Sequence, residues 1–486
     1  MKKSRIYNKI IAFGLSAGLA LAALGCTKAA DSPVNDTDRP VDDTGEVVGT
    51  DAEDGKPEST VVGIGVDFGS GSDDTGTTES GETEEMPILR DCIEIRLGEG
   101  TLVGCAVTQS EIQDPKVWEI VTKYFSAVTI GNELKPDALV GYSVTNCPGT
   151  TTDTLNGEEI VVPKLDYSRA EFILDKILEW NNENPDRQIK VRGHVLVWHS
   201  QTPEWFFHVD YDKNKPYVDS DTMNKRLEWY IKTVLTHFTG EDSKYKGMFY
   251  GWDVVNEAIS DGTCTYRTDA ENASEPLSQD RHGSNSSWWH VYQSNEYIIN
   301  AFIYANKYAP ADLELYYNDY NETNFNKQKG ILALLQAVKE QEGEPGVGTR
   351  IDAMGMQGHY SMDSPSSTEI EAAIQLYASV VGNVQLTEMD VSASSSYDGS
   401  DEAKEEEYEK LRKRYNMIYF AVKNAVLRDD VNITCLTFWG TVDHYSWLQS
   451  RSDVGGGSTT GLPQCPLLFD EHYEPKSAYY VFTNTN

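Results

Sequence analysis

Residues 249–257 read "FYGWDVVNE", an apolar, β-branched run that ends in the amide of Asn256 and the carboxylate of Glu257. From about residue 100 the chain repeats this pattern: a short apolar run, then polar loop residues, then a segment with helical periodicity. The other apolar runs lie at residues 102–107, 127–133, 191–198, 313–319, 351–359, 384–391 and 433–440.

The segments between these runs have the spacing of amphipathic helices. Residues 168–184 and 401–427 are the longest examples. The apolar residues at helical spacing in the first are Phe172, Ile173, Ile177 and Trp180. Because strands that alternate with helices pair in parallel through right-handed crossovers, eight such units predict an α/β fold, a closed (β/α)8 TIM barrel. An open doubly wound sheet is the alternative, but such sheets usually have about five or six strands, and no phosphate-binding loop is recognisable here.

The N-terminus has the pattern of a targeting signal. Basic residues in "MKKSRIYNK" precede the apolar run "IIAFGLSAGLALAALG", which is short for a membrane span and rich in small residues. The run ends in "ALGC", so Cys26 resembles the lipid-modified cysteine of bacterial lipoproteins, and we expect lipid attachment there. Ordinary signal cleavage near "KAA", residues 28–30, is the alternative.

An acidic tether follows this signal. Residues 27–86 hold 17 Asp or Glu against three Lys or Arg, and such a segment cannot bury enough apolar surface to offset its chain entropy. We therefore divide the chain into a lipoprotein signal peptide (1–26), a disordered acidic low-complexity linker (27–88) and a single (β/α)8 domain (89–486). This organisation predicts an exported protein, lipid-anchored to the bacterial cell envelope or cell surface and otherwise secreted, whose only contact with a membrane is the anchor.

Composition restricts the class of partner. The formal net charge is −36, which argues against nucleic-acid binding because phosphate contacts require a basic face. The chain has 27 Tyr and 10 Trp, side chains that suit flat, hydroxyl-rich ligands. A neutral polymer is therefore a possible binding partner for a chain of this composition. We expect the protein to be a monomer.

The cysteines after Cys26 do not form a recognisable metal site. They are Cys92, Cys105, Cys147, Cys264, Cys435 and Cys465. No C-x-x-C spacing occurs, so we expect no zinc and no other metal. Export permits disulfides, but the sequence does not choose among the pairings. Cys105 and Cys435 lie in apolar runs, where buried free thiols are expected.

The C-terminal ends of the predicted strands carry the polar and aromatic side chains. Chemistry in such barrels occurs at these strand ends. In chain order they hold Asn132, Glu133 and Lys135; His194, Trp198, His199 and Gln201; Asn256 and Glu257; Asp319, Tyr320 and Asn321; Gln357 and His359; Glu388 and Asp390; and Trp439 and Asp443. Taken singly, each has a structural explanation as a cap, a core group or a solvated residue. Together on one rim they indicate a site.

Two carboxylates on this rim suggest the chemistry. Glycoside hydrolysis needs one carboxyl group to protonate the leaving oxygen and a second to attack the sugar or activate water, and Glu257 and Glu388 fit these roles. The indoles available to sugar rings are those of Trp198, Trp439 and Trp447; the groups available to sugar hydroxyls are those of Asn132, Lys135, Gln201, Asn256 and Gln357. His359 is placed to hold a carboxylate in position. His194 and His199 lack an H-E-x-x-H context and are not expected to bind metal.

Six segments of this rim resemble, in order, the signature segments of the glycoside hydrolase family 10 endo-β-1,4-xylanases. They are "VRGHVLVWHSQTPEWF" (191–206), "WDVVNEA" (252–258), "LYYNDYN" (315–321), "MGMQGH" (354–359), "LTEMDVS" (386–392) and "TFWGTVDHYSW" (437–447). A further segment, "PLLFDEHYEPKSAYY" (466–480), resembles the start of their C-terminal helix. The resemblance covers about residues 98–484, essentially the whole predicted domain.

The resemblance implies a retaining endo-1,4-β-xylanase that acts on xylan or xylo-oligosaccharides without a cofactor. It implies that Glu257 is the general acid/base and Glu388 the nucleophile. The positions that match residues binding glycone sugars or positioning the nucleophile are Asn132, Lys135, His194, Trp198, Gln201, Asn256, Gln357, His359, Trp439 and Trp447. Tyr320 matches an aglycone contact.

Two features depart from the family pattern. The family usually has Glu-Asn-Glu-x-Lys where this chain has "GNELK", so that Gly131 replaces a carboxylate expected to bond a sugar. Residues 140–164 form a longer connection than usual, and we expect it to lie over the glycone side of the cleft. Two other functions remain as alternatives: a glycan-binding surface lipoprotein without catalysis, and a related barrel hydrolase that acts on β-glucan or mannan.

Overall fold

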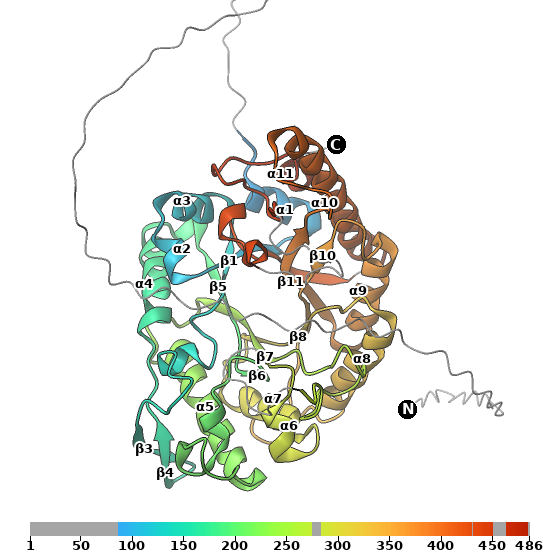
Figure 1. Cartoon of the computed structure of the whole chain (residues 1–486). Helices are drawn as coiled ribbons and strands as arrows, with labels where there is room; N and C mark the ends of the chain where they lie inside the picture. Colours follow the sequence, from blue (N-terminus) through green and yellow to red (C-terminus); the bar gives the residue numbers. More distant parts are fainter. Residues whose placement is uncertain (1–85, 275–282, 430, 451–462, 485–486) are drawn as a thin grey trace, which may run out of the picture. The chain divides into compact units, whose positions relative to one another are not determined.

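Eight parallel strands close into a barrel in the computed structural model, which describes residues 86–274, 283–429, 431–450 and 463–484 (Figure 1). They are β1 (Leu102–Val107), β2 (Ala127–Ile130), β5 (Lys190–Gly193), β7 (Phe249–Asn256), β8 (Glu314–Asp319), β9 (Ala353–Met356), β11 (Asn383–Ser392) and β12 (Asn432–Phe438). Each strand pairs in parallel with the next, β9 pairs with β11, and β12 pairs with β1. The predicted (β/α)8 barrel is therefore confirmed, with a strand at each of the eight apolar runs.

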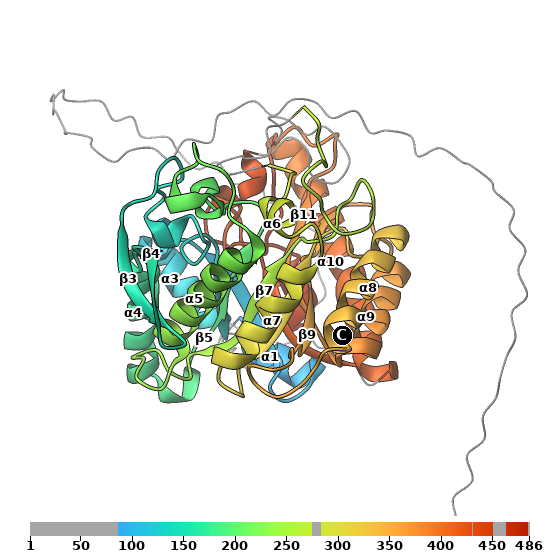
Figure 2. The same ribbon diagram turned by 90° about the horizontal axis from the view of Figure 1, so that it is seen from below.

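Helices surround the strands. They are α1 (Leu89–Leu97), α2 (Gln109–Gln113), α3 (Pro115–Tyr124), α4 (Ser168–Glu183), α5 (Ser220–Thr239), α6 (Ser287–Tyr292), α7 (Glu296–Tyr308), α8 (Phe325–Lys339), α9 (Ser367–Val381), α10 (Asp401–Asp429) and α11 (Tyr479–Thr483). Figure 2 shows the barrel with α4 and α5 on one side and α8, α9 and α10 on the other. Two short strands, β6 (Val197–Trp198) and β10 (His359–Ser361), extend the rim by pairing with β7 and β11.

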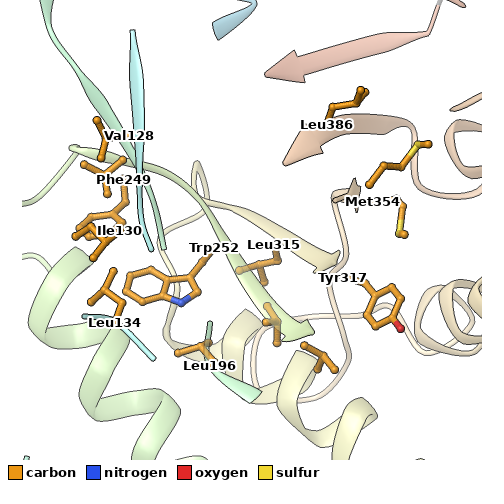
Figure 3. Close-up of a cluster of buried hydrophobic side chains, with 14 of the residues drawn as sticks. Val128, Ile130, Leu134, Leu196, Phe249, Trp252, Leu315, Tyr317, Met354 and Leu386 are labelled. Atoms are coloured by element: carbon orange, nitrogen blue, oxygen red, sulfur yellow. The ribbon is translucent and has the colours of Figure 1, made fainter. Parts of the chain in front are cut away.

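Buried hydrophobic side chains of the strands and the surrounding segments, Trp252 among them, form the core (Figure 3). A Cβ atom on Gly193 would lie 2.1 Å from Cδ2 of Trp252, and one on Gly251 would lie 2.1 Å from Cε2 of Tyr316. Because any larger residue would clash with these rings, both glycines are required by packing. The thiols of Cys105 and Cys435 are buried and free as expected, and the other four cysteines of the described chain are also free.

The predicted buried face of α4 was partly wrong. Ile173 and Ile177 are buried, but Phe172 is 40% exposed. The buried face instead includes Ala170 and Leu174. Both are two residues from Phe172 and therefore lie on the opposite side of the helix.

The long connection after β2 contains an antiparallel hairpin, which the sequence did not predict. Its strands are β3 (Thr150–Leu155) and β4 (Glu158–Pro163), joined by Asn156 and Gly157 at φ of 51° and 87°. Asn-Gly at positive φ is typical of a two-residue hairpin turn. The Asn156 amide donates to Glu228 of α5 (3.0 Å) and Trp229 of α5 donates to Asp153 (2.8 Å). The hairpin therefore packs on the outer helix α5 and does not cover the cleft, which corrects the expected position of this part of residues 140–164.

The predicted signal peptide, Cys26 and nearly all of the linker lie outside the described residues. Among the helices that the structure does describe, none combines the length and the apolar character needed to cross a membrane.

Candidate active site

Glu257 occupies a strained position at the end of β7. Its φ is 54°, a left-handed conformation that is uncommon outside glycine and is concentrated at functional sites. Its backbone is fixed on both sides, because its N–H donates to the Asn318 carbonyl (2.9 Å) and its carbonyl accepts from Arg267 (3.1 Å). The half-buried carboxylate accepts from the Trp198 indole N–H at Oε2 (2.9 Å) and from the Gln357 amide at Oε1 (3.0 Å).

Glu388 lies deeper, in the C-terminal half of β11. Its Oε1 accepts a hydrogen bond of 2.8 Å from Asn318, and its Oε2 lies 3.2 Å from Nε2 of His359. The other ring nitrogen of His359 lies 2.9 Å from Asp390 Oδ1. Both nitrogens of His359 therefore face acceptors, which requires a proton on each and gives the ring a positive charge.

Three amide side chains connect the two glutamates. Asn256 Oδ1 accepts from Asn318 (2.9 Å) and from Gln357 (3.2 Å), while these same amides donate to Glu388 and Glu257 respectively. Asn256 and Asn318 are register partners on β7 and β8. Glu257 and Glu388 thus belong to one rigid hydrogen-bond network, and the Asn256 amide N–H groups are oriented by it.

The surroundings keep Glu388 ionised. Burial alone would raise its pKa, but the hydrogen bond from His359 and the electrostatic interactions with His194, His359 and Arg192 lower that pKa to about 2. Burial would likewise lower the pKa of His359, yet the carboxylates of Asp390 and Glu388 raise it to about 10. At neutral pH the pair is a carboxylate beside an imidazolium.

A second buried ion cluster supports the backbone next to Glu388. Arg192 donates to both oxygens of Asp253 (3.2 and 2.9 Å) and to the carbonyl of Thr387 (2.9 Å). Asp253 Oδ2 also lies 2.8 Å from Nδ1 of His194. Arg192 and Asp253 are fully buried, and their opposite charges compensate each other there. Through its hydrogen bond to the Thr387 carbonyl, Arg192 also fixes the residue that precedes Glu388.

Lys135 organises the neighbouring part of the rim. Its ammonium donates to Asn132 Oδ1 and Gln201 Oε1, both at 3.1 Å, and lies 5.2 Å from the ring centroid of Trp198. Gln201, at φ 47°, also donates to Asp137 (3.3 Å). Burial lowers the pKa of Lys135, while the carboxylate of Asp137 and more distant acids act in the opposite direction. These groups form a polar wall beside Glu257.

Aromatic rings complete the site. The Trp447 indole donates to Asp390 Oδ2 (2.6 Å), and the Trp439 ring lies edge-on to His194 with centroids 5.5 Å apart. Tyr320 follows β8, where the Lys327 ammonium lies 3.7 Å from its ring centroid. Tyr320 thus borders the site beside a buried lysine.

The structure brings together eleven of the predicted site residues: Asn132, Lys135, His194, Trp198, Gln201, Asn256, Glu257, Gln357, His359, Glu388 and Trp447. Trp439 packs beside His194, and Tyr320 lies at the margin. Other rim residues have structural roles. Asp443 forms a buried ion pair with Lys476 (2.7 Å), and Glu133 accepts from the backbone N–H of Gln109 (2.6 Å).

Asn318 and Asp253 are not among the site residues predicted from the sequence, because each precedes the residues that end its predicted strand. The signal that was available is the polarity of these two side chains within otherwise apolar runs. Among the described residues, no group of three or more His, Cys, Asp or Glu side chains is arranged to hold a metal ion.

Comparisons with known proteins agree with this geometry. The model of glycosyl hydrolase family 10 matches residues 94–485. The bifunctional endo-1,4-beta-xylanase XylA of Ruminococcus flavefaciens is 31% identical over 378 residues, covering 78% of this chain and 32% of that protein. Endo-1,4-beta-xylanase B of Paenibacillus barcinonensis is 33% identical over 383 residues, covering 78% of this chain and 93% of that protein. The chain thus spans about a third of the first of these relatives and nearly all of the second.

Solved structures of xylanases also resemble this chain. The crystal structure of xylanase XynB from Paenibacillus barcinonensis with a conduramine derivative matches with a TM-score of 0.61 at 28% identity, covering 83% of this chain and all of that one. The N-terminal endo-1,4-beta-D-xylanase 10B of Clostridium thermocellum, complexed with xylohexaose, matches with a TM-score of 0.63 at 28% identity, covering 82% of this chain and 67% of that one.

Proposed function

Because the chain belongs to glycosyl hydrolase family 10, we propose that it is an endo-1,4-β-xylanase that cleaves internal bonds of xylan by a retaining double displacement. The observation that carries the proposal is the contrast between two linked carboxylates. Glu388 is buried beside the His359 imidazolium, whereas Glu257 is half-buried and contacts the neutral donors Trp198 and Gln357. A charged partner favours a permanent carboxylate, as a nucleophile requires, and the more exposed Glu257 is left as the acid/base of the linked pair.

In the first step, Glu388 attacks the anomeric carbon of the sugar. Glu257 donates its proton to the glycosidic oxygen, so that the aglycone leaves as an alcohol and a glycosyl ester forms on Glu388. In the second step, Glu257 as a carboxylate takes a proton from water, which attacks the same carbon and releases Glu388. Two inversions leave the product with its original β configuration.

The remaining residues bind and orient the sugar in this proposal. The amides of Asn256, Gln357 and Gln201, with Lys135, are placed to bind hydroxyls, and Trp439 and Trp447 to pack against the ring. The mechanism needs no metal or cofactor, because acid, base and nucleophile are supplied by the chain.

The deciding experiment is release of reducing ends from xylan, cellulose and mannan measured side by side. Preferential hydrolysis of xylan to a mixture of oligosaccharides, with products initially in the β configuration by NMR, is the expected result. Hydrolysis of another polymer would reassign the substrate, and binding without hydrolysis would favour a glycan-binding protein.

We also propose that the enzyme is exported and anchored through a lipid on Cys26. The proposal rests on the sequence alone: the basic and apolar leader, the "ALGC" segment and the acidic segment after it. Two or three acyl chains give enough buried CH2 groups for stable anchoring.

A further inference from the structure

Two tyrosines outside the site described above share one carboxylate oxygen on the barrel rim. The hydroxyl groups of Tyr445 and Tyr473 donate to Asp114 Oδ2 at 3.2 and 2.6 Å. The other oxygen of Asp114 accepts from the backbone N–H of Lys116 (2.9 Å), which caps α3. Since Asp114 is held by the helix that it caps, it fixes the orientation of both phenol rings.

This pair, with the neighbouring ring of His444, forms an exposed aromatic patch. Tyr445 is 38% exposed although its hydroxyl is bonded, so the patch presents ring surface to solvent. His444 lies against Tyr445 with centroids 4.1 Å apart, and the Lys116 ammonium lies 4.6 Å from the centroid of Tyr473. Tyr445 is therefore the ring available for contact, while Tyr473 and Asp114 hold it in place.

The patch lies on the same rim as the carboxylates. Asp114 follows β1 and Tyr445 follows β12, and these two strands are neighbours in the barrel. Tyr445 is two residues before Trp447, whose indole contacts Asp390 beside His359. The patch thus lies close along the chain to Trp447, and on its other side β1 adjoins β2, which leads to Lys135.

We propose that Tyr445 is part of a distal subsite that binds one sugar unit of a neutral β-1,4-linked chain extending out of the active site. This proposal rests on the proposed function and adds a binding position to it. A sugar ring has a flat apolar face that stacks on an aromatic ring, and the fixed geometry lowers the entropic cost of that contact. A protein partner fits less well, because three rings offer far less area than the roughly 1,000 Å² of a stable interface.

The alternative is that the tyrosines only attach residues 470–474 to the start of α3. The two explanations differ in their dependence on substrate length. A distal subsite contributes only when the chain is long enough to reach it, whereas an attachment affects stability and all substrates alike.

The test compares Tyr445→Ala, Tyr445→Phe and the control Phe420→Ala in the full protein. Phe420 is an exposed aromatic residue on α10, away from the rim. We expect Tyr445→Ala to lower kcat/KM on xylohexaose by about threefold to tenfold, the range of an exposed aromatic contact, and to leave xylotriose unchanged. Tyr445→Phe, which keeps the ring, should lose less, and Phe420→Ala should lose nothing.

Wild-type cleavage of xylohexaose is measured first, with the melting temperature of each variant. Absence of any wild-type cleavage would overturn the proposed function and this subsite with it. Wild-type cleavage combined with an equal loss at all lengths, or with no loss in Tyr445→Ala, would overturn the subsite alone.

Discussion

Replacing His359 with asparagine should move the acidic limb of the activity profile to higher pH. His359 lies 3.2 Å from Glu388 and 2.9 Å from Asp390, and both of its ring nitrogens face carboxylate oxygens. Asparagine removes the positive charge and leaves Glu388 buried. The carboxylate of Glu388 therefore becomes harder to form and takes up a proton at a higher pH.

The expected size follows from the pKa of Glu388. Burial would raise that pKa, and the hydrogen bond from His359, together with the charges of His194, His359 and Arg192, instead lowers it from 4.5 to about 2. A hydrogen bond to a charged group contributes about 1.5–3 kcal/mol, which corresponds to about one to two pH units. Glu388, as the proposed nucleophile, must be ionised, so activity is lost as the pH falls through its pKa. The midpoint of the acidic limb should therefore move to higher pH by at least that amount.

The assay is kcat/KM against pH on an aryl β-xylobioside with a good leaving group. Such a substrate needs no proton from Glu257 in the first step, so its acidic limb reports Glu388. The matched control is His237→Asn, since His237 pairs with Glu171 (3.1 Å) on the outer helices. A profile that keeps its acidic limb and falls uniformly would exclude this role of His359, because it would mean that His359 only packs against Glu388.

Three further predictions concern the pair, the glycone side and the anchor. Glu388→Ala should abolish turnover of every substrate, whereas Glu257→Ala should keep the first step on aryl glycosides and be rescued by azide as a β-glycosyl azide; an α-azide product would contradict these roles. Gly131→Glu should fold, because its Cβ would lie 3.5 Å from the nearest atom, and should lower KM on short xylo-oligosaccharides by about tenfold through a hydrogen bond to a charged group; an unchanged or higher KM would show that the missing carboxylate is not what limits glycone binding. Cys26→Ser should release the protein from the membrane fraction into the soluble one, and unchanged partitioning into detergent would exclude the anchor.

The barrel could be predicted from the sequence because its signal is local and repeated. Each apolar run has the length of a strand buried on both faces, and each connection has helical spacing. The face of α4 was harder, because Phe172 and Leu174 are equally apolar but lie on opposite sides of the helix, and only the packing on the barrel shows which side is buried. The hairpin at residues 150–163 was missed although "NG" marks its turn, because its strands are mostly polar and their contacts are to α5, far along the chain.

The site shows the same limit. Strand ends could be identified from the sequence, and they contain Glu257, Glu388 and most of their neighbours. Asn318 could not be assigned in this way, because its importance comes from the register between β7 and β8, which places it beside Asn256. That register lets one amide donate to both Asn256 and Glu388, so the position of the Glu388 carboxylate depends on a neighbouring strand pair.

Because the position of Glu388 depends on these neighbours, their hydrogen bonds restrict which residues fit at the buried polar positions around it. The side-chain amide of Asn318 donates its N–H groups to Glu388 and Asn256. Its carbonyl oxygen, Oδ1, accepts a hydrogen bond from the Thr387 hydroxyl (2.6 Å). A Cβ atom on Gly355 would lie 2.4 Å from that carbonyl oxygen, so no larger residue fits at position 355 without displacing the amide. Four strands thus meet at one side chain: β7 through Asn256, β8 through Asn318, β9 through Gly355 and β11 through Glu388. A change in any of them should shift the carboxylate of Glu388, because a buried amide with all its partners fixed has no second arrangement to adopt.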